Sequence, residues 1–485
     1  MEHAGFIDGR MVAGEGDTFV VENPSDESTV VEIRGVSAAQ VDAAIGAARR
    51  AFDDGRWSGL TMVQRGETMR RYAEALRKHA DRLKELAILE AGCPVSSTVM
   101  GAQVHSPLRM TDEIIDLFLK LPETEENPLP LHERVNPHFT VQSLKRWSPL
   151  GVVSAISAYN VPFYTAFWKV VPALMAGDSV ILRPNPLTPI SSLIFAEAAA
   201  EAGIPDGVLN VLIEGWLEGG QMMTTDERVD MVSFTGSCTV GARVAQQAAP
   251  TLKRLVLELG GKSAQIYLPD SADRAAQAAF SVCTSHAGQG CVLGTRIFVP
   301  EEAKPRVLEA MAAAVANVKI GPANDPATQL GPVISAAQRD RCEHFTRAAV
   351  EGGGRVVTGG KRPAEFNKGF YFEPTVLDLP DNKNPAAQEE IFGPVVGVIG
   401  YRDLDHAVEM ANDSKFGLSG WVHGADKVKA LEVGTRIRSG AVNINGALMS
   451  TYASTGGIKM SGVGRERGVE GLREFQIMTT LNIGG

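Results

Sequence analysis

Several features that would assign a chain to a large protein class are missing from this sequence. Its five cysteines are scattered over 485 residues, are odd in number and show no metal-ligand spacing. We therefore expect reduced thiols, a cytoplasmic location and no metal site. No basic segment followed by an apolar one opens the sequence, and no apolar run could span a bilayer. Neither a signal peptide nor a membrane partner is expected.

Basic residues are fewer than acidic ones in this sequence. The 47 Lys and Arg residues are outnumbered by 57 Asp and Glu residues, which gives a net charge of −10. This balance argues against a nucleic acid or an anionic membrane as a partner. Short repeats and low-complexity segments are absent too. A hydrophobic content of 44% is ordinary for a soluble globular protein, and 485 residues are too many for one core, so two or three domains are expected.

The first part of the chain changes from short β-like pieces to helical periodicity. Residues 1–35 mix apolar pairs with turn residues, and apolar residues then recur at helical spacing from Ser37 to Glu90. Ser37 is a plausible N-cap of the first helix. Residues 122–138 are rich in Pro, Glu and Asn and indicate a linker or an excursion from the body. Two β-like runs, 139–147 and 477–483, lie outside the central region.

From Gly151 onward, strand-like runs alternate with helical ones. This alternation predicts parallel sheets that bind ligands at the carboxyl ends of their strands. The first set has expected strands at 152–156, 179–182, 208–213 and 231–234, and helices at 161–175 and 190–202. The second set has expected helices at 272–282, 305–318 and 336–351, and strands at 355–358, 375–377, 395–399 and 441–444. We therefore predict an α/β protein with two domains of similar design that face each other.

The usual Gly-x-Gly-x-x-Gly phosphate fingerprint is absent. In its place Phe234-Thr-Gly236-Ser237-Cys-Thr-Val240-Gly241 follows one expected strand and precedes a helix. Backbone amides at such a helix N-terminus can hold a pyrophosphate. The signal is modest, because any tight turn between a strand and a helix can use Gly and Ser.

Two segments carry candidate chemistry. Cys291 lies in a loop of small residues between Gly288 and Gly290 on one side and a strand-like run on the other, and Glu258 ends another strand-like run. A cysteine nucleophile and a carboxylate base are the groups needed for covalent catalysis on a carbonyl. Each is weak alone, because a lone cysteine is usually a small buried hydrophobic residue and a Glu before Gly-Gly is often only a strand end.

Together with a third motif, these segments resemble the aldehyde dehydrogenase superfamily. The three motifs are Gly-Gln-Gly-Cys at 288–291, Leu-Glu-Leu-Gly-Gly-Lys at 257–262 and Glu-Glu-Ile-Phe-Gly-Pro-Val at 389–395. The resemblance runs from about Asn23 to the C-terminus. It implies a Rossmann-like cofactor domain, a second α/β catalytic domain and a small β oligomerisation arm. The cofactor domain is expected to contain residues 1–127 and 147–258, and residues 459–475 are expected to return to it. The catalytic domain is expected at 259–458, and the arm at 128–146 and 476–485.

The resemblance also implies roles for four catalytic residues. Cys291 would attack the aldehyde carbon to give a thiohemiacetal, which loses a hydride and becomes a thioester. Glu258 would activate the water that hydrolyses the thioester. The side-chain amide of Asn160, with the backbone amide of the cysteine, would form the oxyanion hole, although Asn160 could also cap the following helix. Lys169 would assist proton transfer or hold local structure.

The cofactor implied by the resemblance is NAD, with NADP also accepted. The positions that match its binding site are Ile156, Ser157, Arg183, Asn185, Phe234, Gly236, Ser237, Val240, Glu390 and Phe392. One segment departs from the family, because Arg183 and Pro186 stand where Lys and Glu are common. The missing carboxylate would have repelled a 2′-phosphate, and Arg183 could bind one through two hydrogen bonds.

The matching positions for the substrate tunnel are apolar or small: Val161, Tyr164, Thr165, Trp168, Val292, Met449 and Thr455. Thr455 stands where the family often has an aromatic residue. No Arg or Lys is evident that would clamp a substrate carboxylate, so a medium or bulky hydrophobic or aromatic aldehyde is expected.

The function expected from the sequence is the oxidation of an aldehyde to a free carboxylic acid by a homodimer or homotetramer. Two alternatives stay open. A CoA-acylating aldehyde dehydrogenase would use a thiol in place of water, but it would not need Glu258 as a base. A non-catalytic ligand-binding protein of the same fold is the second alternative, because a fold alone does not fix a function. Such a protein would not need Cys291, Glu258 and Asn160, so their presence argues against it.

Overall fold

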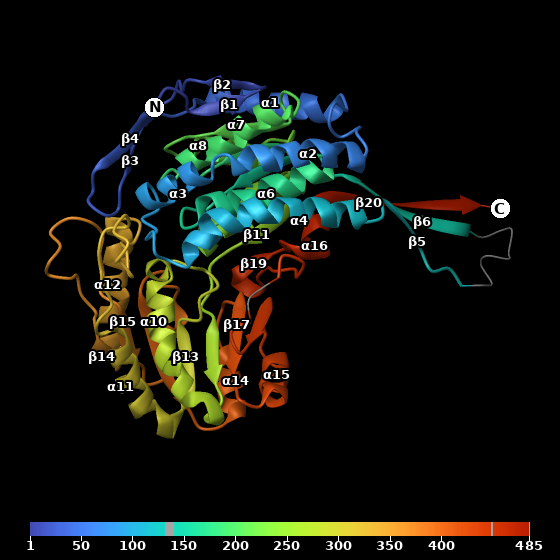
Figure 1. Ribbon diagram of the computed structural model, residues 1–485. Coiled ribbons are helices and arrows are strands. Elements are labelled where there is room, and N and C mark those ends of the chain that lie inside the picture. Colours follow the sequence, from blue (N-terminus) through green and yellow to red (C-terminus); the bar gives the residue numbers. More distant parts are fainter. Residues whose placement is uncertain (131–139, 448–449, 485) are drawn as a thin grey trace.

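Two large sheets of mainly parallel strands organise the protein, and a third, smaller sheet extends from them (Figure 1). The computed structural model describes residues 1–485 apart from 131–139, 448–449 and 485. In Figure 1 the two large sheets with their helices form the upper and lower parts of the molecule. The mixed α/β class expected from the sequence is confirmed.

The first sheet has the strand order β19-β11-β10-β7-β8-β9-β1-β2. Its strands are β1 (Gly5–Ile7), β2 (Arg10–Val12), β7 (Val152–Ile156), β8 (Ser179–Arg183), β9 (Leu209–Leu212), β10 (Met231–Thr235), β11 (Arg254–Glu258) and β19 (Gly462–Val463). The five strands from β11 to β9 are parallel. Every residue of β7 and β8 is buried, as expected for parallel strands covered on both faces.

Helices cover this first sheet. They are α1 (Ala38–Asp53), α2 (Met62–Arg77), α3 (Ala80–Leu89), α4 (Ser106–Lys120), α6 (Pro162–Ala176), α7 (Leu193–Ala202), α8 (Glu218–Thr225), α9 (Cys238–Ala248) and α16 (Gly468–Arg473). Ser37 caps α1 as predicted, and it forms a capping box with Gln40. Helix α6 is apolar on nearly all sides and lies almost wholly in the core, which fixes the residues at its ends.

The second large sheet has the order β14-β15-β16-β13-β12-β17-β18. Its strands are β12 (Ala264–Tyr267), β13 (Arg296–Pro300), β14 (Arg355–Thr358), β15 (Thr375–Asp378), β16 (Val395–Tyr401), β17 (Ser419–His423) and β18 (Ala441–Ile444). Its helices are α10 (Ala276–Thr284), α11 (Lys304–Val315), α12 (Ala336–Glu351), α13 (Pro385–Gln388), α14 (Leu404–Asn412) and α15 (Lys427–Thr435). Only β14 pairs antiparallel, at the edge.

The smaller sheet is an arm that projects from the body, with the C-terminus at its tip (Figure 1). It contains β5 (Thr124–Glu126), β6 (Thr140–Pro149) and β20 (Gln476–Gly484), in the order β20-β6-β5. The pairing of β20 with β6 brings the C-terminal tail beside a segment more than 300 residues earlier. Residues 124–126, expected within a linker, are a strand because β6 offers them a pairing edge. The pair β3 (Thr18–Glu22) and β4 (Thr29–Arg34) forms a separate two-stranded sheet.

The register of the first sheet brings four site residues to one edge. Glu258 lies opposite Thr235, Phe234 opposite Ile156, and Ile156 opposite Arg183. All four strands run the same way, so their carboxyl ends and the loops that follow them meet there. Within the part of the chain that the structure describes, no helix is long and apolar enough to cross a membrane.

Candidate active site

A cavity of about 1070 Å³ lies at this edge of the first sheet. It is lined both by residues that follow β7, β8, β10 and β11 and by the loop that carries Cys291. Every catalytic, cofactor and substrate residue expected from the sequence lines this cavity, apart from Lys169 and Met449. Lys169 lies behind the lining, and Met449 falls outside the described residues.

The loop before β13 holds Cys291 through its neighbour Gln289. The Gln289 side chain accepts a hydrogen bond from the Ile334 amide at 2.9 Å and donates to the His286 carbonyl at 3.2 Å. Gly288 has a φ of +71°, and a Cβ there would lie 2.0 Å from the Gly393 carbonyl oxygen. The loop therefore needs glycine at this position.

The thiol of Cys291 is held in its neutral form. Burial, and next the charges of the nearby Glu390 and Glu258 carboxylates, raise its pKa to about 12. A reacting enzyme must therefore remove the thiol proton with a base or bring positive charge close to the sulfur.

Asn160 is joined to the cysteine loop. Its Nδ2 atom donates to the Gln289 carbonyl at 2.8 Å, and its own carbonyl accepts from Gln103 at 2.9 Å. The alternative that Asn160 caps α6 is wrong, because Val161 stands at the cap position and no side chain makes a cap hydrogen bond there. The link to the loop leaves the second Nδ2 hydrogen for a ligand in the cavity.

Glu258 belongs to a buried cluster with Lys169 and Glu466. The Lys169 Nζ atom lies 2.9 Å from Glu466 Oε1 and 3.2 Å from Ser233 Oγ. One Glu258 oxygen has no hydrogen-bond partner among the described residues. Burial, and next the charge of Glu466, raise the pKa of Glu258 to about 8, while Lys169 opposes the shift. A carboxyl group with such a pKa can exchange protons near neutral pH.

Another part of the cavity is lined by the N-terminus of α9. Ser237 caps α9, and its Oγ atom accepts from the Val240 amide at 3.3 Å. A Cβ on Gly236 would lie 2.4 Å from the Phe234 ring, so a larger side chain at this position would clash with that ring. The free amides at this helix N-terminus suit a pyrophosphate.

Two residues from the 389–395 motif lie beside the cysteine loop. Glu390 accepts from the Gly261 amide at 2.9 Å, and burial raises the pKa of its carboxyl. Phe392 has a φ of +62°, and its ring meets Tyr159 edge-on with centroids 5.9 Å apart. A strained aromatic residue that lines a cavity is typical of a ligand site.

The expectation that Arg183 could hold a 2′-phosphate with two donors is wrong for this conformation. Its Nε atom donates to Glu214 and its Nη2 atom to the Trp216 carbonyl. Glu214 is buried and also accepts from the amides of Gly219 and Gly220, each at 3.0 Å. The sequence reasoning missed Glu214, whose one signal was an acidic residue directly after the apolar run 208–213.

The sequence showed no Arg or Lys placed to clamp a substrate carboxylate, but the structure places an arginine in the substrate region of the cavity. Arg467 lines the cavity beside Tyr164 and Trp168. It was missed because it follows the matching motif by one residue and contacts side chains about 300 positions earlier.

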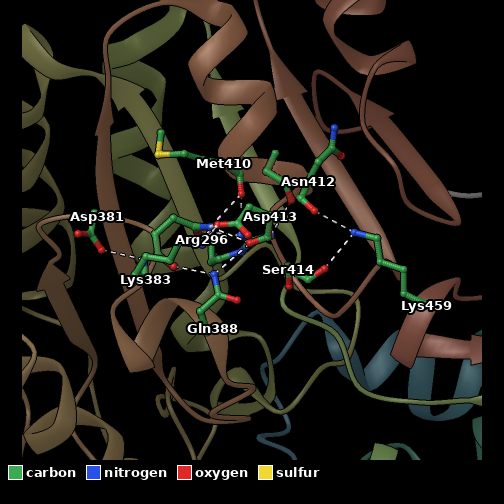
Figure 2. A network of polar contacts seen from close by, with 11 residues as sticks. Arg296, Asp381, Lys383, Gln388, Met410, Asn412, Asp413, Ser414 and Lys459 are labelled. Carbon is green, nitrogen blue, oxygen red and sulfur yellow. Dashed lines mark hydrogen bonds and ion pairs between the residues drawn. The ribbon is translucent and has the colours of Figure 1, made fainter.

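A second buried arginine positions the strands next to the site (Figure 2). Arg296, at the start of β13, donates to the Lys262 carbonyl at 2.8 Å and to Asn382 Oδ1 at 2.9 Å. It also reaches the carbonyls of Met410 and Ala411 at 3.1 and 3.0 Å. The Lys262 turn follows Glu258 and the Arg296 strand follows Cys291, so this one side chain ties the two catalytic segments together.

Replacing Arg296 with methionine is expected to lower the free energy of unfolding by about 3 kcal/mol or more, because several buried acceptors lose their donors. Denaturant unfolding would measure the loss. The control is Arg436→Met, because Arg436 is exposed and pairs with Asp405 on the surface at 2.7 Å. That change should cost about 1 kcal/mol or less. Equal losses in the two variants would contradict the role given to Arg296.

Comparisons with known proteins agree with this geometry. The family model described as the aldehyde dehydrogenase family matches residues 11–481. Geranial dehydrogenase from Castellaniella defragrans is 36% identical over 479 residues, which cover 97% of this chain and 96% of that protein.

Two solved structures have the same fold over almost the whole chain. An aldehyde dehydrogenase from Mycobacterium tuberculosis, in complex with NAD+, is 37% identical with a TM-score of 0.93. The match covers 99% of this chain and 97% of that protein. A mutant of aldehyde dehydrogenase C from Pseudomonas syringae, in complex with NAD+ and octanal, is 34% identical with a TM-score of 0.92. The match covers 99% of this chain and 96% of that protein. The chain belongs to the aldehyde dehydrogenase family.

Proposed function

We propose that this enzyme oxidises an aldehyde to a free carboxylic acid with NAD+ as the hydride acceptor. The observation that carries the proposal is the convergence of Cys291, Glu258 and Asn160 on one cavity. The structures of two relatives that were solved with NAD+ support the choice of cofactor. Residues 1–127 and 147–258 would form the cofactor domain and residues 259–458 the catalytic domain.

In the first half of the reaction, Cys291 gives up its proton to solvent water, and the thiolate forms a C–S bond with the aldehyde carbon. The carbonyl π electrons move to oxygen, where the Asn160 amide and the Cys291 backbone N–H stabilise the negative charge. Bound NAD+ supplies the acceptor for the hydride that leaves when the C=O bond re-forms as a thioester. Lys169, through Glu466, would set the charge around Glu258.

In the second half, Glu258 takes a proton from water as the water oxygen attacks the thioester carbon. The C–S bond then breaks, the electron pair returns to sulfur together with the proton held by Glu258, and the carboxylic acid leaves. One aldehyde, one NAD+ and one water give one acid, one NADH and one proton. The CoA-acylating alternative is disfavoured because it has no use for a buried carboxyl with a pKa of about 8.

For the cofactor, the amides near Ser237 would hold the pyrophosphate, and Glu390 and Phe392 would hold the nicotinamide end. Ile156, Ser157 and Asn185 would line the path between them. The engagement of Arg183 by Glu214 favours NAD+ over NADP+, because the guanidinium is neutralised and two of its donor atoms are occupied.

Replacing Glu214 with glutamine should therefore shift the enzyme toward NADP+. Without the carboxylate, Arg183 is free to pair with a 2′-phosphate, and a charge-assisted hydrogen bond is worth about 1.5–3 kcal/mol. The NADP+/NAD+ ratio of kcat/KM should rise about tenfold or more. Steady-state kinetics with both cofactors would measure it. The double change with Arg183→Met should bring the ratio back down, and an unchanged ratio in Glu214→Gln would contradict the proposal.

We also propose that the arm joins subunits in a homodimer or homotetramer. Ile477, Leu481 and Ile483 lie on one face of β20 and are each 40–44% exposed, which leaves an apolar strand face in water. Sedimentation velocity would give the oligomeric state, and a monomer at micromolar concentration would contradict this assignment. The five free cysteines suit a reducing compartment, and we propose the cytoplasm.

The first test of the function is the appearance of NADH absorbance when the protein is given aliphatic and aromatic aldehydes without CoA. NAD+ and NADP+ are supplied in separate wells. A signal only after CoA is added would favour the acylating alternative. Silence with and without CoA, in a protein that still binds NAD+, would favour the non-catalytic one.

A further inference from the structure

Arg467 is a charged residue inside the cavity that has no carboxylate partner among the described residues. Its guanidinium carbon lies 5.1 Å from the centroid of the Trp168 ring and 5.5 Å from that of Tyr164. Its Nη2 atom donates to the Tyr164 hydroxyl, and within the described chain its remaining N–H groups have no acceptor. Two buried arginines near the cavity differ from it, because Arg183 is paired with Glu214 and Arg296 with carbonyl groups.

The charge of Arg467 persists despite its surroundings. Burial lowers the pKa of its guanidinium to about 10, so it stays a cation at neutral pH. Arg467 is half-buried, and a partly desolvated cation without a counter-ion is stabilised by an anion that pairs with it. The neighbouring Glu466 does not serve, because its carboxylate pairs with Lys169.

The backbone of Arg467 is strained as well. It has a φ of +61° and a ψ of 173°, in a region that is almost exclusive to glycine and costs other residues about 1–3 kcal/mol. The preceding residue is fixed by a pair of hydrogen bonds between Glu466 and Thr455, at 2.8 and 2.7 Å, and Gly468 begins α16 directly afterwards. The fold thus tolerates a strained residue whose side chain lines the substrate region.

The substrate region runs along helix α6, from the end next to Asn160 toward Trp168. Asn160 lies just before the helix, and Tyr164 and Trp168 lie one turn apart along it. With a rise of 1.5 Å per residue, the two aromatic residues are about 6 and 12 Å along the axis from the oxyanion donor. A substrate whose carbonyl lies between Asn160 and Cys291 therefore extends its other end toward Arg467.

We propose that Arg467 binds a carboxylate at the far end of the substrate, so that the preferred substrates are aldehydes that carry a second, ionised acid group. This inference rests on the proposed oxidation of aldehydes and names its substrate class. The Tyr164 hydroxyl accepts a hydrogen bond from Arg467, so its own proton is available for the same carboxylate. Tyr164 and Trp168 would pack against the carbon chain and hold the guanidinium between them.

The test compares aldehydes that differ only in the acid group: 4-oxobutanoate with butanal, 5-oxopentanoate with pentanal, and 6-oxohexanoate with hexanal. For at least one pair, the wild-type kcat/KM should favour the acid by about tenfold or more, mainly through KM, as expected for a charge-assisted pair of about 1.5 kcal/mol or more. An aldehyde that bears a quaternary ammonium group should be a poor substrate, because its charge repels Arg467.

Substitutions then assign the preference to this side chain. Arg467→Met should lower the acid-to-neutral ratio at least about tenfold, and Arg467→Lys should keep part of it, because lysine retains the charge but not the planar fork. Tyr164→Phe should give a smaller loss. The ratio cancels any general damage to the enzyme. Arg436→Met, a surface change outside the cavity, should keep the wild-type ratio.

A measurement on the unmodified enzyme serves if the variants fail to fold. Glutarate should inhibit competitively against the aldehyde at about a tenfold lower concentration than pentanoate, because only the diacid reaches Arg467 with one group and the oxyanion donors with the other. Equal inhibition, a wild-type preference for neutral aldehydes, or an unchanged ratio in Arg467→Met would overturn the inference. The failure of the proposed function has a different signature, since no aldehyde of either kind would then be oxidised.

Discussion

Replacing Cys291 with alanine is expected to reduce aldehyde-dependent NADH formation by at least about 10⁴-fold, because the covalent route needs a nucleophile at that position. Removal of one member of a catalytic unit typically costs nearly as much as removal of all of them. Single-turnover absorbance at the NADH band would measure the loss. Binding of NAD+, followed by calorimetry, should persist, because Cys291 faces the cavity and does not support the turn at Ser237.

The matched control for this change is Cys283→Ala. Cys283 is a buried thiol on α10, eight positions earlier in the chain, and its Sγ atom lies 3.3 Å from the Pro394 carbonyl oxygen. If Cys283 were a redox partner of Cys291, its removal would also impair turnover; we expect it to keep near-normal rates. Substantial oxidation by Cys291→Ala would show that the thiol is not the nucleophile.

The sequence predicted those elements whose local signals agree with their final environment. Helix α12 was expected at 336–351 and spans Ala336–Glu351, because Ser335 caps its first turn and glycines follow its last. Strands β7 and β8 are continuous apolar runs and were found nearly to the residue. In these segments periodicity, caps and burial all favour the same structure.

Short strands that depend on their neighbours were not predicted. Strand β17 has the sequence Ser419-Gly-Trp-Val-His423, which has weak β propensity at its start, and it is a strand because β12 and β18 flank it on both sides. Strand β12 has only four residues and follows the Gly-Gly-Lys turn. Pairing of this kind is a tertiary effect and overrides local propensity.

The same distinction applies to the site. Cys291, Glu258 and Asn160 stand in recognisable motifs, and the parallel register explains why distant motifs converge. The partners of charged residues are different, because they depend on which side chains the fold brings together. Arg183 meets Glu214 31 positions later, and Arg467 meets Tyr164 303 positions earlier. A list of matching positions cannot supply these pairs, although they set the expected cofactor and substrate preferences.

Replacing Glu258 with glutamine should separate the two halves of the reaction. Hydride transfer from the thiohemiacetal does not need the base once the thiol has reacted, whereas hydrolysis of the thioester does. The variant should release about one equivalent of NADH per active site and then turn over about 10²–10⁴-fold more slowly than the wild type. Rapid mixing would resolve the burst, and mass spectrometry of the quenched protein would detect the acyl group on Cys291.

The pH dependence gives this prediction its sharpest form. The base is the ionised carboxylate, and burial with the charge of Glu466 raises the pKa of Glu258 to about 8. Below that pH most of the carboxyl is protonated and inactive, so hydrolysis should rise about tenfold per pH unit and level off above it. In Glu258→Gln this rise should disappear. Hydroxylamine, a nucleophile that needs no base, should release the acyl group from the variant. If Glu258→Gln instead hydrolysed its thioester at the wild-type rate with the same pH profile, another group would be the base, and the buried Glu258 would serve only to tune the charge around Cys291.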